Sequence, residues 1–192
     1  MKVPDDQELI EEILGGSQAA MEVLTRKYYK SIYAFIYRKV GDKETAYDLT
    51  QEVFIKVIQR IQSYSHKGTF KSWLFSIAIN HCRDYWGSAY YRHTSQKTEL
   101  PETLESDEKS IPYIFERKVM REQVRLALAS LPDYQKEALI LKYFHHMKIK
   151  EISKVTNTSV PTVKSRLKQG LNKLAKLLRR GEVDEQEKNR QD

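Results

Sequence analysis

Residues 151–174 read EISKVTNTSVPTVKSRLKQGLNKL, and the spacing of apolar residues in and around this stretch predicts two helices. The first is short and is marked by Ile149, Ile152 and Val155. The second spans 160–178 and is marked by an apolar face of Val163, Leu167, Leu171, Leu174 and Leu178. Asn157 in the turn tolerates a left-handed backbone, and Ser159 is suited to cap the second helix. A short helix, a tight turn and a longer helix predict a helix-turn-helix.

The positive charge of the chain is concentrated around this helix-turn-helix. The 192 residues hold 33 Lys and Arg against 26 Asp and Glu. Residues 145–180 hold ten of these cations and one acid, Glu151. Such a charge density favours an anionic partner, and a polyphosphate backbone is the commonest one. A solvated basic helix face is the alternative that charge alone leaves open.

The start of the second helix carries the candidate contacts to duplex DNA. Early positions of a recognition helix enter the major groove, where Lys and Arg can donate to guanine and Ser can contact several bases. The candidate contacts are Ser159, Thr162, Lys164, Ser165, Arg166 and Lys168. Cations further along the helix are placed to meet phosphates instead.

A second candidate site combines aromatic and basic residues between positions 64 and 92. Its rings are Tyr64, Phe70, Trp73, Tyr85, Trp86, Tyr90 and Tyr91. Its polar residues are Lys67, Lys71, Asn80, Arg83 and Arg92. Rings among cations suit single-stranded nucleic acid, where stacking contributes about 1–3 kcal/mol per base. For Phe70 and Trp73 a place in the hydrophobic core is an equally good interpretation, since Trp73 also lies on the inward stripe of its helix.

The whole chain is predicted to be all-α, with two small helical domains. Only seven Gly and five Pro occur, and no alternation of strands and turns is visible. Helices are expected over 5–14, 17–41, 42–61, 70–91, 115–130 and 134–143. Residues 94–113 hold two prolines and five acids, which predicts a flexible linker. The resulting domains are 1–93 and 114–180, followed by an unstructured polar tail over 181–192.

Several classes of protein are excluded or disfavoured by what the sequence lacks. No phosphate-binding glycine loop, nucleophile elbow or zinc-protease motif is present, so an enzyme is not expected. Neighbouring side chains on a helix diverge by about 100°, so the pairs 81–82 and 145–146 do not predict a metal site. We expect no cofactor, no metal and no small-molecule substrate. Without an apolar run of about 18 residues or a signal peptide, the chain is expected in the cytoplasm.

Four strings of the sequence resemble the extracytoplasmic-function sigma factors, the small group IV members of the bacterial sigma-70 family. They are DLTQEVFIKVIQRI (48–61), FKSWLFSIAINHCRDYW (70–86), SLPDYQKEALILKYF (130–144) and the stretch 151–174. The resemblance implies a dissociable subunit of bacterial RNA polymerase. It further implies that the first domain binds the clamp helices of the core enzyme and melts the minus-ten element. The second domain would bind the minus-thirty-five element and the flap, and an anti-sigma factor would be a further partner.

The resemblance also assigns roles to single residues. The core-binding residues that it implies are Asp48, Gln51, Glu52 and Phe54. The polar residues of this helix could equally be ordinary solvent-exposed side chains. The minus-ten residues, around a loop that would hold a flipped base, are Tyr64, Lys67, Phe70, Trp73, Asn80 and Arg83. The minus-thirty-five residues are the six candidate contacts of the helix-turn-helix, with Arg166 on a phosphate. The alternative function is a stand-alone helix-turn-helix regulator, which would not require the first two sets.

Overall fold

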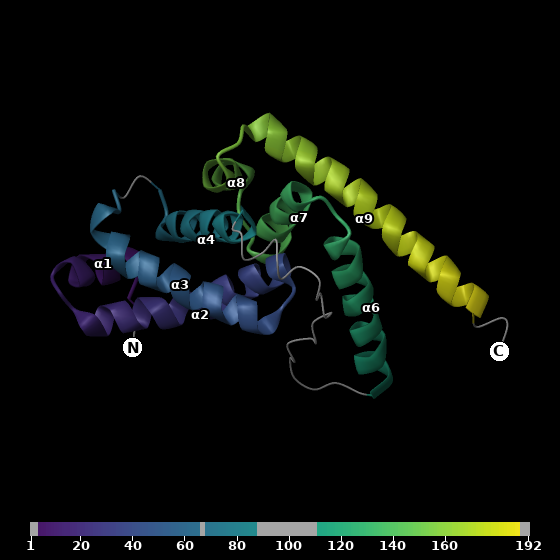
Figure 1. Ribbon diagram of the computed structural model, residues 1–192, viewed down its shortest axis with the longest axis horizontal. Coiled ribbons are helices and arrows are strands. Elements are labelled where there is room, and N and C mark those ends of the chain that lie inside the picture. The colour runs from purple at the N-terminus through teal and green to yellow at the C-terminus, as the bar shows by residue number, and fades with distance from the viewer. Residues whose placement is uncertain (1–3, 66–67, 88–110, 189–192) are drawn as a thin grey trace. The chain divides into compact units, whose positions relative to one another are not determined.

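The structure is a computed structural model that describes residues 4–65, 68–87 and 111–188, and every regular element in these ranges is helical (Figure 1). The described residues form two units. Residues 4–87 belong to the first unit together with 150–158, and residues 111–149 belong to the second together with 159–188. The predicted domain boundaries remain predictions, because the linker residues 94–110 lie outside the described ranges.

Four α-helices and a short 3-10 turn make up residues 6–87 of the first unit. They are α1 (Asp6–Leu14), α2 (Gln18–Val40), α3 (Lys43–Arg60), η1 (Ile61–Ser63) and α4 (Phe70–Gly87). The predicted helix starts are confirmed, since Asp5, Ser17 and Asp42 each accept a hydrogen bond from the first turn that follows. The helix predicted over 70–91 is described through Gly87, and Tyr90 and Tyr91 lie outside the described residues.

Gly41 sets the angle between α2 and α3. Its φ of 85° is left-handed, and its N–H donates to the carbonyl of Tyr37 at 2.9 Å. Only a residue without a Cβ adopts this conformation without strain, so Gly41 ends α2 as its sequence position predicted.

The core of the first unit lies where α2, α3 and α4 meet. The stripe predicted on α3 is buried throughout, at Ala46, Leu49, Val53 and Val57, and Ile61 continues it. Phe35 of α2 and Phe75 of α4 meet edge to face at 5.4 Å and are both fully buried. Burying each side chain of this size contributes about 1.5–3 kcal/mol relative to exposure, so this core holds α3 and α4 in fixed register.

The helices between residues 111 and 188 follow the predicted order, but several of their boundaries differ from the prediction. The elements are α6 (Ile111–Ala129), α7 (Asp133–Leu139), a π turn η2 (Ile140–Phe144), α8 (Ile149–Thr156) and α9 (Val160–Lys188). Residues 111–113, expected in the linker, already belong to α6. The helix expected over 134–143 changes to a π turn after Leu139.

Helix α9 differs most from its prediction. The tail expected to be unstructured continues α9 as far as Lys188, because Glu, Gln and Lys after Gly181 are good helix formers. Of the predicted apolar face, Val163 and Leu167 are buried, whereas Leu171 is 40% exposed. Gly170 packs against α7, where an added Cβ would lie 3.1 Å from Leu139. The close approach at Gly170 therefore marks the end of the tightly packed part of α9.

Candidate functional site

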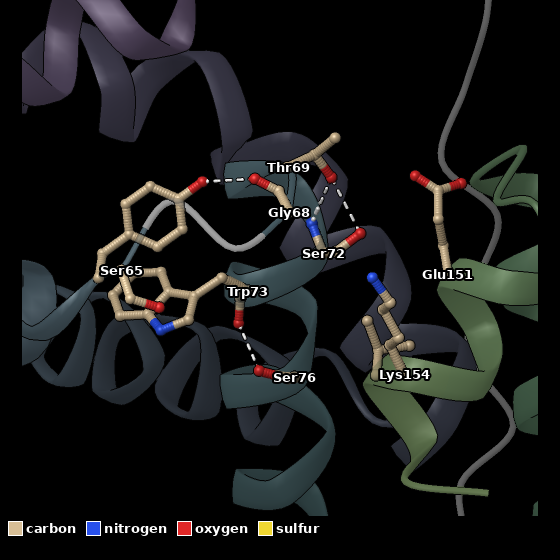
Figure 2. Close-up of a pocket in the computed structure, with 10 residues that line it drawn as sticks. Ser65, Gly68, Thr69, Ser72, Trp73, Ser76, Glu151 and Lys154 are labelled. Atoms are coloured by element: carbon tan, nitrogen blue, oxygen red, sulfur yellow. Dashed lines mark hydrogen bonds between the residues drawn. The ribbon is translucent and has the colours of Figure 1, made fainter.

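Three aromatic rings gather where the loop after η1 enters α4. Tyr64 lies 5.3 Å from Trp73 and 5.8 Å from Phe70, and Phe70 lies 5.5 Å from Trp73, each measured between ring centroids. Tyr64 and Trp73 are half-buried and line a pocket with Gly68, Thr69 and polar side chains of α4 (Figure 2). We call Tyr64, Gly68, Thr69 and Trp73 the aromatic pocket.

Phe70 differs from the other two rings, because it is only 2% exposed. A ring buried to this extent cannot stack on a nucleic-acid base, so the direct DNA contact predicted for Phe70 does not match the structure. The alternative interpretation, a place in the core, holds for this residue. Phe70 supports Tyr64 and Trp73 from the interior of the unit.

Short-range hydrogen bonds shape the aromatic pocket. The hydroxyl of Tyr64 donates to the carbonyl of Gly68 at 2.9 Å, which joins residues on the two sides of positions 66–67. Thr69 caps α4, because its hydroxyl oxygen accepts from the N–H of Ser72 at 3.2 Å (Figure 2). Lys67, a predicted DNA contact in this loop, lies outside the described residues. The described part of the loop is held by the pocket's own side chains.

The other predicted DNA contacts of the first unit continue along α4 from the aromatic pocket. Trp73, Ser76, Asn80 and Arg83 follow one another at spacings of three or four residues, which places them on one side of the helix. Asn80 and Arg83 are exposed. The structure thus places Trp73, Asn80 and Arg83 on one side of α4, with Tyr64 next to Trp73.

The outer surface of α3 combines polar and apolar side chains. Of the predicted core-binding residues, Asp48, Gln51 and Glu52 are exposed. Phe54 is 6% exposed and stacks on Tyr29 of α2 at 5.8 Å, so it supports the surface without forming it. The predicted direct contact of Phe54 therefore does not match the structure.

The sequence analysis missed three large apolar residues on the same helix. Tyr47, Ile55 and Ile58 are 52%, 53% and 52% exposed. Together with Gln51 they lie within an arc of about 80° at 100° per residue, and we call these four residues the α3 face. Their positions off the buried stripe of α3 were a signal that could have revealed them. Clustered exposed apolar side chains are typical of a protein-binding surface.

A buried histidine connects α3 to α4 beside this face. The Nδ1 atom of His81 lies 2.8 Å from the ammonium of Lys56, and Oε2 of Glu52 lies 2.8 Å from Nε2. The approach of Glu52 is not aligned as a hydrogen bond. Burial first, and then the positive charge of Lys56, lowers the pKa of His81, although Glu52 and Asp84 act in the opposite direction. Neutral His81 can accept at Nδ1 from Lys56.

The turn before α9 has the predicted geometry. Asn157 has a φ of 51°, in the left-handed region that its position requires. The hydroxyl oxygen of Ser159 accepts from the N–H of Thr162 at 3.2 Å and so caps α9. Ser159 and Thr162 are exposed, but their hydroxyls also pair with each other at 2.7 Å.

The start of α9 presents the predicted basic residues to solvent. Lys164, Ser165 and Lys168 are exposed and lie within an arc of about 100° on the helix. Gln169 donates to the hydroxyl oxygen of Ser165 at 3.2 Å, which orients that side chain. Arg166 is half-buried, with its guanidinium 5.4 Å from the ring centre of Tyr134. Lys164, Ser165 and Lys168 are thus accessible, whereas Arg166 packs against Tyr134 of α7, and the DNA contacts of all four residues stay predictions.

The described residues show neither of two other kinds of site. No group of three or more His, Cys, Asp or Glu side chains in these ranges could hold a metal ion. No helix in the described ranges is long and apolar enough to span a bilayer.

An aromatic pocket on one helical unit and a basic helix-turn-helix further along the chain define a nucleic-acid-binding protein of two parts. Residues 24–90 match the family Sigma-70 region 2, and residues 121–174 match Sigma-70 region 4. The chain belongs to the sigma-70 family, as a sigma factor of the extracytoplasmic-function type.

Individual relatives agree with this assignment. The chain is 30% identical over 170 residues to the RNA polymerase sigma-H factor of Pseudomonas aeruginosa, covering 84% of this chain and 88% of that protein. It is 29% identical over 175 residues to the ECF RNA polymerase sigma factor BldN of Streptomyces coelicolor, covering 89% of this chain and 65% of that protein. The fold resembles that of the sigma factor RpoE of Bartonella quintana, solved with the anti-sigma factor NepR, at a TM-score of 0.67 and 19% identity. That match covers 82% of this chain and 96% of RpoE.

Proposed function

We propose that this chain directs bacterial core RNA polymerase to promoters and helps to open the duplex at the start site. The observation that carries the proposal is one chain with both a site for unstacked bases and a site for duplex DNA. The first is the aromatic pocket with Asn80 and Arg83, and the second is the exposed Lys164, Ser165 and Lys168 at the start of α9. A stand-alone helix-turn-helix regulator needs only the site for duplex DNA. Membership in the sigma-70 family also favours the role of a sigma factor.

Opening the duplex needs no bond chemistry from this chain. Extruding a base costs a few kcal/mol, and stacking on an aromatic ring contributes about 1–3 kcal/mol in return. We infer that Trp73 and Tyr64 receive the extruded base of the minus-ten element, and that Asn80 and Arg83 follow the strand. The chemistry of RNA synthesis is left to the polymerase, so the protein works as a non-enzymatic initiation factor without cofactor or metal, in the cytoplasm.

Docking to the core enzyme is assigned to the α3 face with Asp48 and Glu52. Exposed Tyr47, Ile55 and Ile58 supply the apolar area, and the acids at its edge supply charge complementarity. The second unit would bind the minus-thirty-five element through α9 and the polymerase flap. We also propose an anti-sigma partner, because the sigma factor RpoE, whose fold this chain resembles, was solved with one. Such a partner would occlude the α3 face.

The deciding experiment adds the purified chain to core polymerase and measures run-off transcripts from genomic promoter fragments. We expect co-elution with the core enzyme and transcripts from discrete start sites that core polymerase alone does not use. A chain that binds duplex DNA but gives the core enzyme no start-site preference would instead be a stand-alone regulator.

A further inference from the structure

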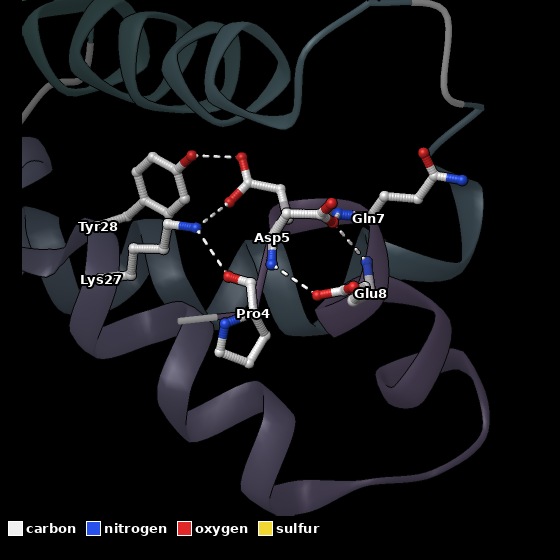
Figure 3. Close-up of polar contacts among 7 residues, drawn as sticks. Pro4, Asp5, Gln7, Glu8, Lys27 and Tyr28 are labelled. Atoms are coloured by element: carbon white, nitrogen blue, oxygen red, sulfur yellow. Dashed lines mark hydrogen bonds and ion pairs between the residues drawn. The ribbon is translucent and has the colours of Figure 1, made fainter. Parts of the chain in front are cut away.

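A hydrogen bond ties the start of α1 to α2 on the side of the aromatic pocket. The hydroxyl of Tyr28 donates to a carboxylate oxygen of Asp6 at 2.5 Å (Figure 3). The other oxygen of Asp6 lies 2.8 Å from the ammonium of Lys27. An O–H donor on a carboxylate at this distance is charge-assisted and among the stronger hydrogen bonds. Burial and then the Asp6 carboxylate raise the pKa of Tyr28, so its hydroxyl keeps the donated proton.

The ring of Tyr28 continues this contact into the aromatic pocket. Its centroid lies 5.5 Å from that of Phe70, with 59° between the ring planes. Phe70 is fully enclosed and touches both Tyr64 and Trp73, as described above. Since a close-packed interior transmits small displacements, the position of the Tyr28 ring affects the two rings that line the pocket.

The last contact in the series reaches the loop itself. Tyr64 donates to the carbonyl of Gly68, whose φ of 141° closes the loop in a conformation that glycine adopts readily. The series therefore runs from Asp6 through Tyr28, Phe70 and Tyr64 to Gly68. Its first two members do not line the pocket, and Phe70 is the packing contact through which Tyr28 reaches the pocket rings.

We propose that Asp6 and Tyr28 are positioning residues for base capture: their hydrogen bond fixes Phe70, and through it the pocket lined by Tyr64, Gly68, Thr69 and Trp73. This inference rests on the proposed function, because it names residues that set the geometry of the proposed base-capture site. It predicts that losing one hydroxyl group on α2 impairs DNA opening while leaving polymerase docking intact.

The test compares Tyr28→Phe with Tyr33→Phe in the holoenzyme. Tyr28→Phe keeps the ring and removes the bond to Asp6. Tyr33 lies on the same helix, is also half-buried and stacks on Tyr37 at 5.9 Å, away from the aromatic pocket. Permanganate reactivity of promoter thymines measures opening, and affinity for core polymerase and the thermal midpoint are measured in parallel. We expect Tyr28→Phe to lower opening roughly three- to tenfold, and Tyr33→Phe to leave it unchanged.

A double-mutant cycle and a spectroscopic signal separate positioning from a general loss of stability. Asp6→Ala combined with Tyr28→Phe should impair opening no more than the stronger single variant, because both remove one interaction. Lys27→Met removes the ion pair to Asp6 and the hydrogen bond to the Pro4 carbonyl, keeps the bond between Tyr28 and Asp6, and should retain opening. In a Trp86→Phe background Trp73 is the sole tryptophan, and Tyr28→Phe should shift its fluorescence emission.

The outcomes distinguish this inference from the proposed function. Normal opening by both Tyr28→Phe and Asp6→Ala in an otherwise active holoenzyme would overturn the positioning role and leave the proposed function intact. A parallel loss of opening, core affinity and thermal midpoint would also overturn it, because it would show a purely structural contact. Failure of the wild-type chain to give promoter-dependent transcripts would overturn the proposed function itself.

Discussion

His81 is a buried ionisable group in contact with charged residues on both sides. It is 7% exposed, between Lys56 and Glu52 of α3. Because its pKa is lowered in the folded protein, the unfolded chain binds a proton at this residue more readily. Stability is therefore complete above the usual histidine pKa of about 6.5 and decreases as the pH falls from there toward the lowered pKa.

Replacing His81 should remove part of this pH dependence. Between about pH 7.5 and pH 5.5, the free energy of unfolding of the wild-type protein should fall more than that of His81→Gln. Urea denaturation at several pH values measures both curves. The other four of the five histidines remain in both proteins, so the difference between the curves isolates His81. Parallel curves would show that His81 is not the responsible group.

At the scale of single elements, substitutions of exposed residues on α3 should change docking to core polymerase without changing the stability of the fold. Ile58 is 52% exposed on the α3 face, and Val23 of α2 is 42% exposed outside that face. Truncating either side chain removes little buried area, so both variants should fold with nearly unchanged stability. Their effects on binding should differ.

Ile58→Ser should weaken affinity for core polymerase by roughly 1–2 kcal/mol, whereas Val23→Ser should leave it unchanged. Fluorescence titration of the labelled chain with core enzyme measures both affinities. Equal affinities of Ile58→Ser and wild type would remove the α3 face from the docking surface. A loss in Val23→Ser of the same size would show a different or much wider interface.

Helix α9 offers a comparison between two kinds of DNA contact. Lys164→Ala should lower holoenzyme affinity by about 1–3 kcal/mol and relax preference at one base position. Lys173→Ala, further along the helix, should weaken all upstream sequences alike and reduce the salt slope by about one unit. Binding to promoters with each upstream base varied, at several salt concentrations, measures both effects. Identical behaviour of the two variants would mean that Lys164 does not read a base.

Helix boundaries set by local signals were predictable from the sequence, and features set by tertiary contacts were not. Asp42 and Gly41 act through hydrogen bonds within a few residues, so their residue types sufficed. The burial of Phe70 depends on Tyr28 of another helix, about forty residues earlier, which no local spacing reveals. The exposure of Leu171 likewise depends on which part of α9 packs against its neighbours.

The residues of the candidate sites also divide into those that local spacing predicts and those that only the packed structure reveals. Exposed Lys164 and Gln51 follow from helical spacing, because each lies off a regular apolar stripe. The same spacing places Ile55 and Ile58 off the stripe of α3, but the α3 face was missed because only polar residues and Phe54 were considered for docking. The contact between Asp6 and Tyr28 joins two helices, so only the packed unit reveals it.

At the scale of the whole molecule, the proposed function requires two DNA contacts made by one chain. Of the linker predicted over 94–113, residues 111–113 belong to α6, which leaves 17 residues. A flexible polar chain of that length would span roughly 20–25 Å on average. A tether of this kind holds the second contact at a high effective concentration once the first is made. By itself it does not select one spacing between the DNA elements, so we expect docking of both units on polymerase to fix that spacing.

Promoters with altered spacing test this expectation. Inserting about five base pairs between the two elements rotates one by half a helical turn and moves it by roughly 17 Å. We expect at least a roughly tenfold drop in run-off transcription, to the level of a promoter whose upstream element has been replaced. The replaced promoter is the matched control, because it removes the contact of α9 without changing spacing. Equal transcription at all spacings, from promoters that still need their upstream element, would mean that the tether alone positions the second unit on DNA.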